Sequence, residues 1–462
     1  MLLAFILVYL ALTLSIGIFS SRYVKNSGDF ILAGRQLSLV MATATEFSTW
    51  FGSETVIGAS RKMATEGWVG VIEDPFAVSI CLVLVGYFFA RPLYRMRLLT
   101  FGDFYRTVFG KRAEFIAACA LIVSYFGWIA AQMTAIGIVL HTVAPSISIT
   151  AAVLLSSLVV IAYTFTGGMW SVAITDLIQM IIIVIGMIVV TVIIVQQAGG
   201  LHEIMDKTPK EFFNFFPQGG GHHWLLYTSA LVTGALGSIP QQDVYQRVMS
   251  SRTERIAVNS SYISAGLYLT IALLPLLLGL AARILVPSQL DSETLLPDLI
   301  MQRTDDWVKI FFFGALLSAI MSTASGAILA PSVILSENII KPFLAKRGTV
   351  LPDKKFLLIT RLCILVVAGV SLLFAFSGEG IYELVSEASE ISLVTLFIPL
   401  CAGLFFKSRN EIAAVISMVA GMIAWFIPLR MGSEYPPIFF GLMASLGGYL
   451  IGCRLKFRIA KS

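Results

Sequence analysis

The residues of this chain that are best suited to chemistry are hydroxyl groups placed inside apolar, helix-forming stretches. Residues 316–331, LLSAIMSTASGAILAP, carry Ala319, Ser322, Thr323 and Ser325 at spacings of three and four, which places these four on one face of a helix. Hard cations such as Na⁺ prefer oxygen ligands. The pattern therefore predicts a cation site built from hydroxyls, together with a free carbonyl at Ala319.

A second stretch, TATEFSTWFGS at residues 43–53, concentrates hydroxyls, a glycine and Glu46 between apolar flanks. We expect a helix to break here and to offer carbonyl oxygens near Ala44 and Phe47. The two stretches together would form a five-oxygen site between an intact helix and a broken one. Ser, Thr and Ala are also the residues of close helix packing in membranes, so composition alone leaves the packing interpretation equally open.

Asp176 stands alone as a charge in the apolar stretch SVAITDLIQMIIIVIGMIVVTVII. A carboxylate in hydrocarbon is costly, so such residues usually face a cavity, a counter-charge or a cation. A bound Na⁺ or a proton would satisfy Asp176. A hydroxyl or an arginine of another helix, or a position at the wet inner interface, would satisfy it equally well.

The elements that position these groups are membrane helices. The 462 residues are 57% hydrophobic and 13% charged, with a mean hydropathy of +0.87, which is far outside the range of soluble globular proteins. Spans of about 20 apolar residues predict an all-α membrane protein with 13 transmembrane helices, at 2–20, 38–60, 69–90, 113–142, 149–166, 170–197, 224–244, 257–282, 306–340, 356–377, 381–405, 411–429 and 436–453. The first span is expected to be a retained helix rather than a cleaved signal peptide.

The distribution of basic residues predicts the orientation of these spans. Alternate connecting segments, which include residues 91–112, 247–255 and 341–361, hold 24 of the 32 lysines and arginines. Because cytoplasmic loops carry the excess of basic residues, we expect N-out/C-in topology. The net charge of +5 is then explained by the membrane and does not indicate nucleic acid.

Two five-helix units of similar length predict a 5+5 inverted repeat, the arrangement of many secondary transporters. The expected divisions are 1–37 (an extra helix and the first cytoplasmic loop), 38–197 (repeat 1), 198–223 (an outer loop), 224–405 (repeat 2) and 406–462 (two helices and a basic tail). The first span of repeat 2 contains GALGSIPQQD, where Gly237 and Pro240 should interrupt the helix. Either break could also be a simple kink.

Several classes of site are not indicated. His222 and His223 lie side by side next to a glycine run, a poor arrangement for a tetrahedral metal site, so we read them as solvated and expect no transition metal. The five cysteines lack CxxC spacing and read as free thiols. The chain shows no nucleotide-binding or nucleophile-elbow motif and only four histidines, which argues against an enzyme.

At this point a family resemblance becomes visible. The motifs ALLSAIMSTASGAILAPSVILSENI, YTFTGGMWSVAITDLIQ, ATEFSTW and IPQQDVYQRVMSS resemble the sodium/solute symporter family over residues 20 to 410, and this family has a LeuT-type inverted-repeat fold. The resemblance implies a principal sodium site at the carbonyls of Ala44, Phe47 and Ala319 and the hydroxyls of Ser322 and Thr323. Some members use further groups for a second sodium ion, which fall here on Asp176, Ser322 and Ser325. The last position of that pattern is Gly326, which has no hydroxyl.

The resemblance also places the solute between the two broken helices. The candidates for contacting it are Trp50, Ser53, Gln132, Gln241 and Gln242, with Glu73 and Glu387 as further ones. A choline-like cation would favour an aromatic cage, yet Gln241 stands where a choline carrier would have an aromatic residue. The solute class stays open between an amino acid, a sugar, a choline-like cation and a carboxylate.

These patterns predict a sodium-coupled symporter that imports a small organic solute by alternating access. We expect a multi-pass protein of the plasma (inner) membrane, surrounded by lipid, with no nucleic-acid partner and with a monomer as its state. The alternatives are a proton-coupled symporter and a transporter-like membrane sensor.

Overall fold

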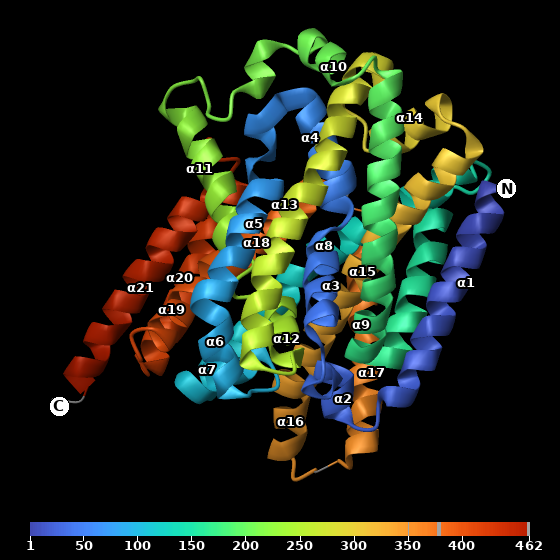
Figure 1. Ribbon diagram of the computed structural model, residues 1–462. Coiled ribbons are helices and arrows are strands. Elements are labelled where there is room, and N and C mark those ends of the chain that lie inside the picture. Colours follow the sequence, from blue (N-terminus) through green and yellow to red (C-terminus); the bar gives the residue numbers. More distant parts are fainter. Residues whose placement is uncertain (350, 377–379, 460–462) are drawn as a thin grey trace.

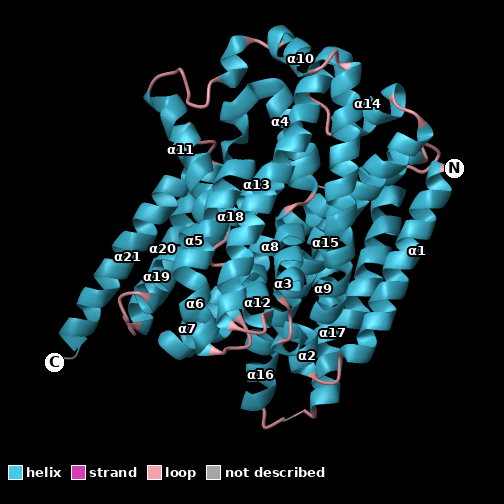
Figure 2. Ribbon diagram, in the orientation of Figure 1, coloured by secondary structure: helices cyan, strands magenta, loops and turns pink. Residues whose placement is uncertain are grey.

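The computed structural model describes residues 1–349, 351–376 and 380–459, and these residues form a bundle of helices. Figure 2 shows helices throughout, with loops gathered at the two ends of the bundle and a few short irregular stretches inside it. The N-terminus lies at the upper right of the view and the C-terminus at the lower left (Figure 1). Residue 377, which ends the predicted tenth span, and the last residues of the basic tail lie outside the described residues.

The first half of the chain contains a long central pair of helices and several short ones. The bounds are α1 (Leu2–Ser20), α2 (Ser27–Leu32), α3 (Leu39–Trp50), α4 (Ala59–Glu66), α5 (Val78–Leu84), α6 (Ala90–Met96), α7 (Phe101–Val108), α8 (Lys111–Val143), α9 (Ile149–Gln197) and α10 (Leu201–Lys207). Wider helical turns at Glu54–Gly58, Ile72–Ala77 and Val85–Phe89 connect α3 to α6.

The second half repeats the alternation of short and long helices. The bounds are α11 (Gly221–Leu236), α12 (Gln242–Ser250), α13 (Glu254–Leu285), α14 (Leu295–Arg303), α15 (Asp306–Ile334), α16 (Lys341–Lys346), α17 (Asp353–Phe374), α18 (Ile381–Ser392), α19 (Ile398–Leu404), α20 (Glu411–Arg430) and α21 (Pro437–Ile459). The short helix α10 lies in the outer loop predicted at 198–223, and α14 lies between the predicted spans 257–282 and 306–340. Both sit at the upper end of the bundle (Figure 1).

Ten helical segments among the described residues are long and apolar enough to cross a membrane, fewer than the thirteen predicted. The difference has three local causes. Helix α9 contains Gly168 with a positive φ of 53°, so one 49-residue segment holds two predicted spans. The predicted spans 38–60 and 224–244 are each divided by an interruption into pieces too short to count alone. The count of thirteen and the N-out/C-in orientation therefore stay predictions.

Helix α15 forms the centre of the molecule. Every residue from Phe312 to Ile334 is buried, and the helix packs against α3, α8 and α9. Small residues permit this close packing: a Cβ on Gly186 of α9 would lie 2.7 Å from the Cβ of Ala315. Polar side chains of α15 are bonded within the protein, as in the 2.7 Å hydrogen bond between Tyr9 Oη and Ser318 Oγ. Protein rather than lipid surrounds α15.

The prediction of free cysteines holds for the described chain, in which all five are unpaired thiols. His222 and His223 are exposed, in agreement with the expectation that they are solvated. One part of the charge count was wrong. Arg247 was counted among inner-loop residues, but it lies on α12 and only 1% of its surface is exposed.

Candidate functional site

Helix α3 ends inside the bundle at Trp50, and the chain leaves helical geometry at Phe51, where ψ is 75°. The freed groups find specific partners. The Trp50 carbonyl accepts hydrogen bonds from Tyr268 Oη at 3.2 Å and from Thr55 Oγ1 at 3.3 Å, and the Ser53 amide donates to Gln132 Oε1 at 3.1 Å. The interruption predicted in residues 43–53 is therefore present and is held open by side chains of three other segments.

Gly52 is required at this interruption because nothing larger fits there. A Cβ on Gly52 would lie 2.5 Å from Glu54 Oε2 and 2.9 Å from Thr323 Oγ1. The carboxylate of Glu54 and the hydroxyl of Thr323 thus both lie close to the Cβ position of Gly52.

The second interruption separates α11, which ends at Leu236, from α12, which begins at Gln242. Ser392 of α18 bonds the freed Gly237 carbonyl at 2.6 Å, and Gln241 Nε2 donates to the same Ser392 hydroxyl at 3.2 Å. The GALGSIPQQD stretch therefore breaks the helix as the sequence indicated.

The five residues of the predicted sodium site lie buried on α3 and α15, two helices that pack together. Ala44, Phe47, Ala319, Ser322 and Thr323 each have 0% exposed surface. The direct link between the helices is the hydrogen bond from Thr323 Oγ1 to the Ser48 carbonyl, at 3.1 Å. The sequence prediction thus named two helices that do meet, and the meeting point is rich in oxygen atoms.

Asp176 lies beside this oxygen cluster. Its Oδ1 accepts a hydrogen bond from Ser322 Oγ at 2.5 Å, and its Oδ2 has no hydrogen-bond partner. Ser325, the other candidate for a second sodium ion, donates to the Ser322 carbonyl at 2.9 Å. Asp176 is therefore bonded on one oxygen and unpaired on the other.

A buried guanidinium lies close to the same place. Arg247 Nη2 is 2.3 Å from the point that a Cβ on Gly326 would occupy, and this nitrogen has no hydrogen-bond partner. Arg247 Nη1 donates to the Asp243 carbonyl at 3.3 Å, and the positive charge of Arg247 acts on Asp176. The Arg247 side chain therefore occupies the space that a side chain at position 326 would need.

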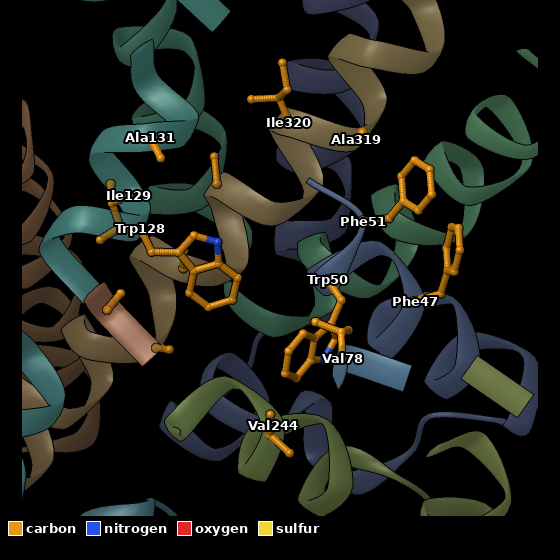
Figure 3. Packing of buried hydrophobic residues seen from close by; sticks show 14 of the residues in the cluster. Phe47, Trp50, Phe51, Val78, Trp128, Ile129, Ala131, Val244, Ala319 and Ile320 are labelled. Atoms are coloured by element: carbon orange, nitrogen blue, oxygen red, sulfur yellow. The ribbon is translucent and has the colours of Figure 1, made fainter. Parts of the chain in front are cut away.

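A cavity with an empty volume of about 480 Å³, part of it open to solvent, lies between the two interruptions. Three acids line it, Glu54, Glu73 and Asp74, and four aromatic residues line it as well: Trp50, Trp128, Tyr268 and Tyr382. Figure 3 shows Trp50 and Val78 side by side with Trp128 across from them, while Phe47 and Phe51 point away to the other side.

The predicted solute contacts are divided by the structure. Trp50 and Gln241 line the cavity, as does Glu73. Ser53 and Gln132 lie one layer behind it, where Gln132 Nε2 donates to Glu54 Oε2 at 2.8 Å. Gln242 lies elsewhere, because its Oε1 accepts a hydrogen bond from the Phe101 amide at 2.6 Å. Glu387, on α18, is also outside the lining.

Glu54 and Asp74 are cavity residues that the sequence reasoning missed. The available signal was the presence of acids within apolar runs, FGSETVIGA and VIEDPFAV, which is the same feature that drew attention to Asp176. Among the described residues, no group of three or more His, Cys, Asp or Glu side chains is placed to hold a metal ion.

Comparisons with known proteins agree with this arrangement. The model of the sodium:solute symporter family matches residues 30–421. A high-affinity choline transporter of Drosophila melanogaster is 28% identical, over 87% of this chain and 67% of the transporter, and a sodium/pantothenate symporter of Haemophilus influenzae is 25% identical, over 97% and 96%. A solved structure described as the substrate-bound outward-open state of a Na⁺-coupled sialic acid symporter has a TM-score of 0.82 at 21% identity, covering 98% of this chain and 96% of that one.

Proposed function

Because this chain belongs to the sodium:solute symporter family, we propose that it imports a small organic solute together with Na⁺ by alternating access. It is a multi-pass membrane transporter and not an enzyme. Its relatives include choline, pantothenate and proline transporters, which supports a small organic solute. We place it in the plasma membrane, as a monomer with the N-terminus outside and residues 38–197 and 224–405 as inverted repeats.

The observation that carries this proposal is the oxygen cluster where interrupted α3 meets intact α15. The ligands of the proposed sodium ion are the carbonyls of Ala44, Phe47 and Ala319 and the hydroxyls of Ser322 and Thr323. These groups are buried, and the bond from Thr323 Oγ1 to the Ser48 carbonyl already joins the two helices. An ion bound by both helices stabilises the conformation in which α3 and α15 are close enough to share it.

This geometry supports a simple form of coupling. The ion binds one conformation more tightly than the other, and that difference in affinity is the free energy available to drive the solute. The inner-negative potential adds about 2.3 kcal/mol per 100 mV for each charge moved inward. Solute binding in the cavity and ion binding can both act on the interruption after α3, because Gly52 of that interruption lies next to both Glu54 and Thr323.

We further propose that one sodium ion, and not two, accompanies each solute. The second set of candidate ligands, Asp176 and Ser325, lies beside Arg247, whose charge acts on Asp176. A guanidinium next to Gly326 repels a second cation and also occupies the space that a serine side chain would need. In this proposal, Arg247 supplies the positive charge that a second sodium ion would otherwise bring to Asp176 and Ser325.

Uptake into proteoliposomes tests the proposal. Full-length protein is reconstituted and supplied with a panel of solutes, with either an inward sodium gradient or an inward proton gradient. We expect accumulation that requires sodium and is enhanced by an inside-negative potential. Accumulation that a pH gradient drives in sodium-free medium would instead support the proton-coupled alternative, for which the buried acids of the cavity would be the carriers.

A further inference from the structure

We propose that the solute accepted by this cavity is a small organic cation, a statement that rests on the proposed symport function and narrows it. The starting observation is the formal charge of the lining. Glu54, Glu73 and Asp74 bring three carboxyl groups to the cavity, whereas the lining set contains no lysine, arginine or histidine. The cavity is therefore lined by acids without a basic partner.

The partners of these acids are neutral hydrogen-bond donors. Glu54 accepts from Trp128 Nε1 at 3.3 Å and from Gln132 Nε2 at 2.8 Å. Asp74 accepts from Tyr268 Oη at 2.6 Å and from Thr55 Oγ1 at 2.7 Å. These donors hold the carboxyl oxygens in place but supply no positive charge. A buried carboxyl group without a basic partner is either protonated or paired with a cation from outside the chain, and we propose that the solute is that cation.

Two basic residues close to cavity-lining Tyr382 and its neighbour Glu383 are already paired. Lys62 Nζ lies 3.4 Å from Glu383 and 3.5 Å from Glu66, and it sits 5.2 Å from the centre of the Tyr382 ring. Arg61 likewise forms an ion pair with Glu383 at 3.2 Å. The charge of Lys62 also acts on Glu73. Glu54 and Asp74 are therefore the two cavity acids without a resident cation of their own.

The aromatic residues give the cavity the surface that an organic cation prefers. Trp50, Trp128, Tyr268 and Tyr382 surround it from four different segments of the chain. Trp128 is held against Tyr125 with ring centroids 5.8 Å apart and an interplanar angle of 26°. Aromatic faces attract ammonium groups, and they do so most strongly where water is excluded.

An independent feature points to an absent ligand. The Tyr382 hydroxyl has no hydrogen-bond partner, although Tyr382 lines the cavity and only 7% of its surface is exposed. Buried hydroxyls are normally satisfied, so an unpaired one facing a cavity indicates a missing polar partner. A hydroxyl or ammonium hydrogen-bond donor on the solute would provide it.

Glu54 lies close to the proposed sodium site as well as to the proposed solute cation. Both its Oε2 and the Thr323 hydroxyl of the proposed sodium site lie within 3 Å of the Cβ position of Gly52. Two cations bound this close repel each other unless negative charge lies between them. Glu54 stands between the two places, and we assign it as the residue that allows solute and ion to be bound together.

The same charge excludes other solutes. A carboxylate-bearing ligand would have to be buried among three acids, which is strongly unfavourable without a basic residue to receive it. The cavity therefore disfavours carboxylic acids and favours ammonium compounds, and the amino acid, sugar and carboxylate options fall behind the choline-like one.

The test uses probes that differ in charge but keep nearly the same shape. Thermal unfolding of purified full-length protein in sodium buffer is followed in the presence of each probe. Two cations are compared with uncharged counterparts: choline with dimethylbutanol, and putrescine with butanediol. Glycine betaine is the probe that carries a carboxylate besides its ammonium group. We expect at least one cation to stabilise the protein with an affinity roughly tenfold or more above that of its uncharged counterpart. Glycine betaine should bind more weakly than choline.

Two variants locate the effect. Glu54→Gln keeps the size of the side chain and should remove most of the preference for the cation over its uncharged isostere. Glu46→Gln is the matched control, because Glu46 is also buried but accepts from Ser260 and Ser261 outside the cavity. The control should keep the full preference. If Glu54→Gln does not accumulate, Glu73→Gln serves in its place.

The outcomes separate this inference from the proposed function. If uncharged or carboxylate probes stabilise the protein as well as the cations do, or if no cation stabilises it, the inference is wrong even when sodium drives uptake of some other solute. If a cation binds through Glu54 but its uptake ignores the sodium gradient, the inference stands and the proposed symport fails.

Discussion

Asp176 and Glu54 are both buried carboxylates placed next to hydroxyls of α15, and they differ in what faces them. Asp176 receives the Ser322 hydroxyl and lies in the field of buried Arg247. Glu54 receives the neutral donors of Trp128 and Gln132 and adjoins the solute cavity. A positive charge of the chain itself acts on Asp176, whereas we propose that Glu54 is neutralised by the transported solute. The first is suited to holding a structure together and the second to changing charge during a cycle.

Removing the built-in charge should have the largest effect. Arg247→Met removes the buried positive charge that acts on Asp176 and Asp243, although neither carboxylate forms an ion pair with it. The cost is therefore at most that of a broken buried charge pair, about 3–5 kcal/mol. We expect a marked fall in the thermal midpoint of purified protein. Arg252→Met, at an exposed position between α12 and α13, is the control and should unfold as the native chain does. Equal stability of the two variants would contradict the role of Arg247.

The hydroxyls that lie between the two acids come next. Ser322→Ala and Thr323→Ala each remove one proposed ligand, which should weaken sodium binding by about 1–3 kcal/mol, or roughly five- to a hundred-fold in half-saturating sodium. Solute affinity should recover at high sodium. Ser332→Ala, whose hydroxyl bonds the Ile328 carbonyl of its own helix, should leave sodium activation unchanged. Unaltered activation in both ligand variants would remove this site.

The contact between Gly326 and Arg247 should give a smaller effect. In Gly326→Ala the new Cβ meets Arg247 Nη2 at 2.3 Å, but that atom is the end of a flexible side chain, so we expect a loss of about 1 kcal/mol, the low end for overpacking. Thermal unfolding measures it. Gly266→Ala has open space around its Cβ and provides the comparison. Stabilisation by Gly326→Ala would mean that the guanidinium does not rest there.

The smallest effect is expected from Asp176→Asn, measured as the ratio of sodium to solute carried. Because the positive charge of Arg247 already acts on Asp176, no second sodium ion should depend on this acid. The ratio of sodium to solute should therefore stay the same. Paired fluxes of labelled sodium and labelled solute give the ratio directly. A drop by one sodium ion per solute would show that Asp176 binds an ion after all.

The surroundings of Asp176 and Glu54 also show which features could be predicted from the sequence and which could not. The hydroxyls of Ser322 and Thr323 and the interruption after Trp50 were predictable, because spacing within one helix and helix-breaking residues are local properties. The role of Arg247 was not, since its place opposite Gly326 depends on how α12 packs against α15. Glu54 and Asp74 stand 20 residues apart in sequence and meet through tertiary folding, while Gln242, adjacent to cavity-lining Gln241, turns toward Phe101 instead.

The burial of α15 from Phe312 to Ile334 bears on how the protein is made. A helix leaving the ribosome enters the bilayer according to its own apolarity, and α15 carries Ser318, Ser322, Thr323 and Ser325 where lipid would offer them nothing. Of the helices that cover it, α1, α3, α8 and α9 precede it in the chain and are synthesised first, whereas α17 follows it. Insertion of α15 therefore depends on partners that are already in the membrane, and faults in assembling the first half of the chain should appear as failure of the second half to insert.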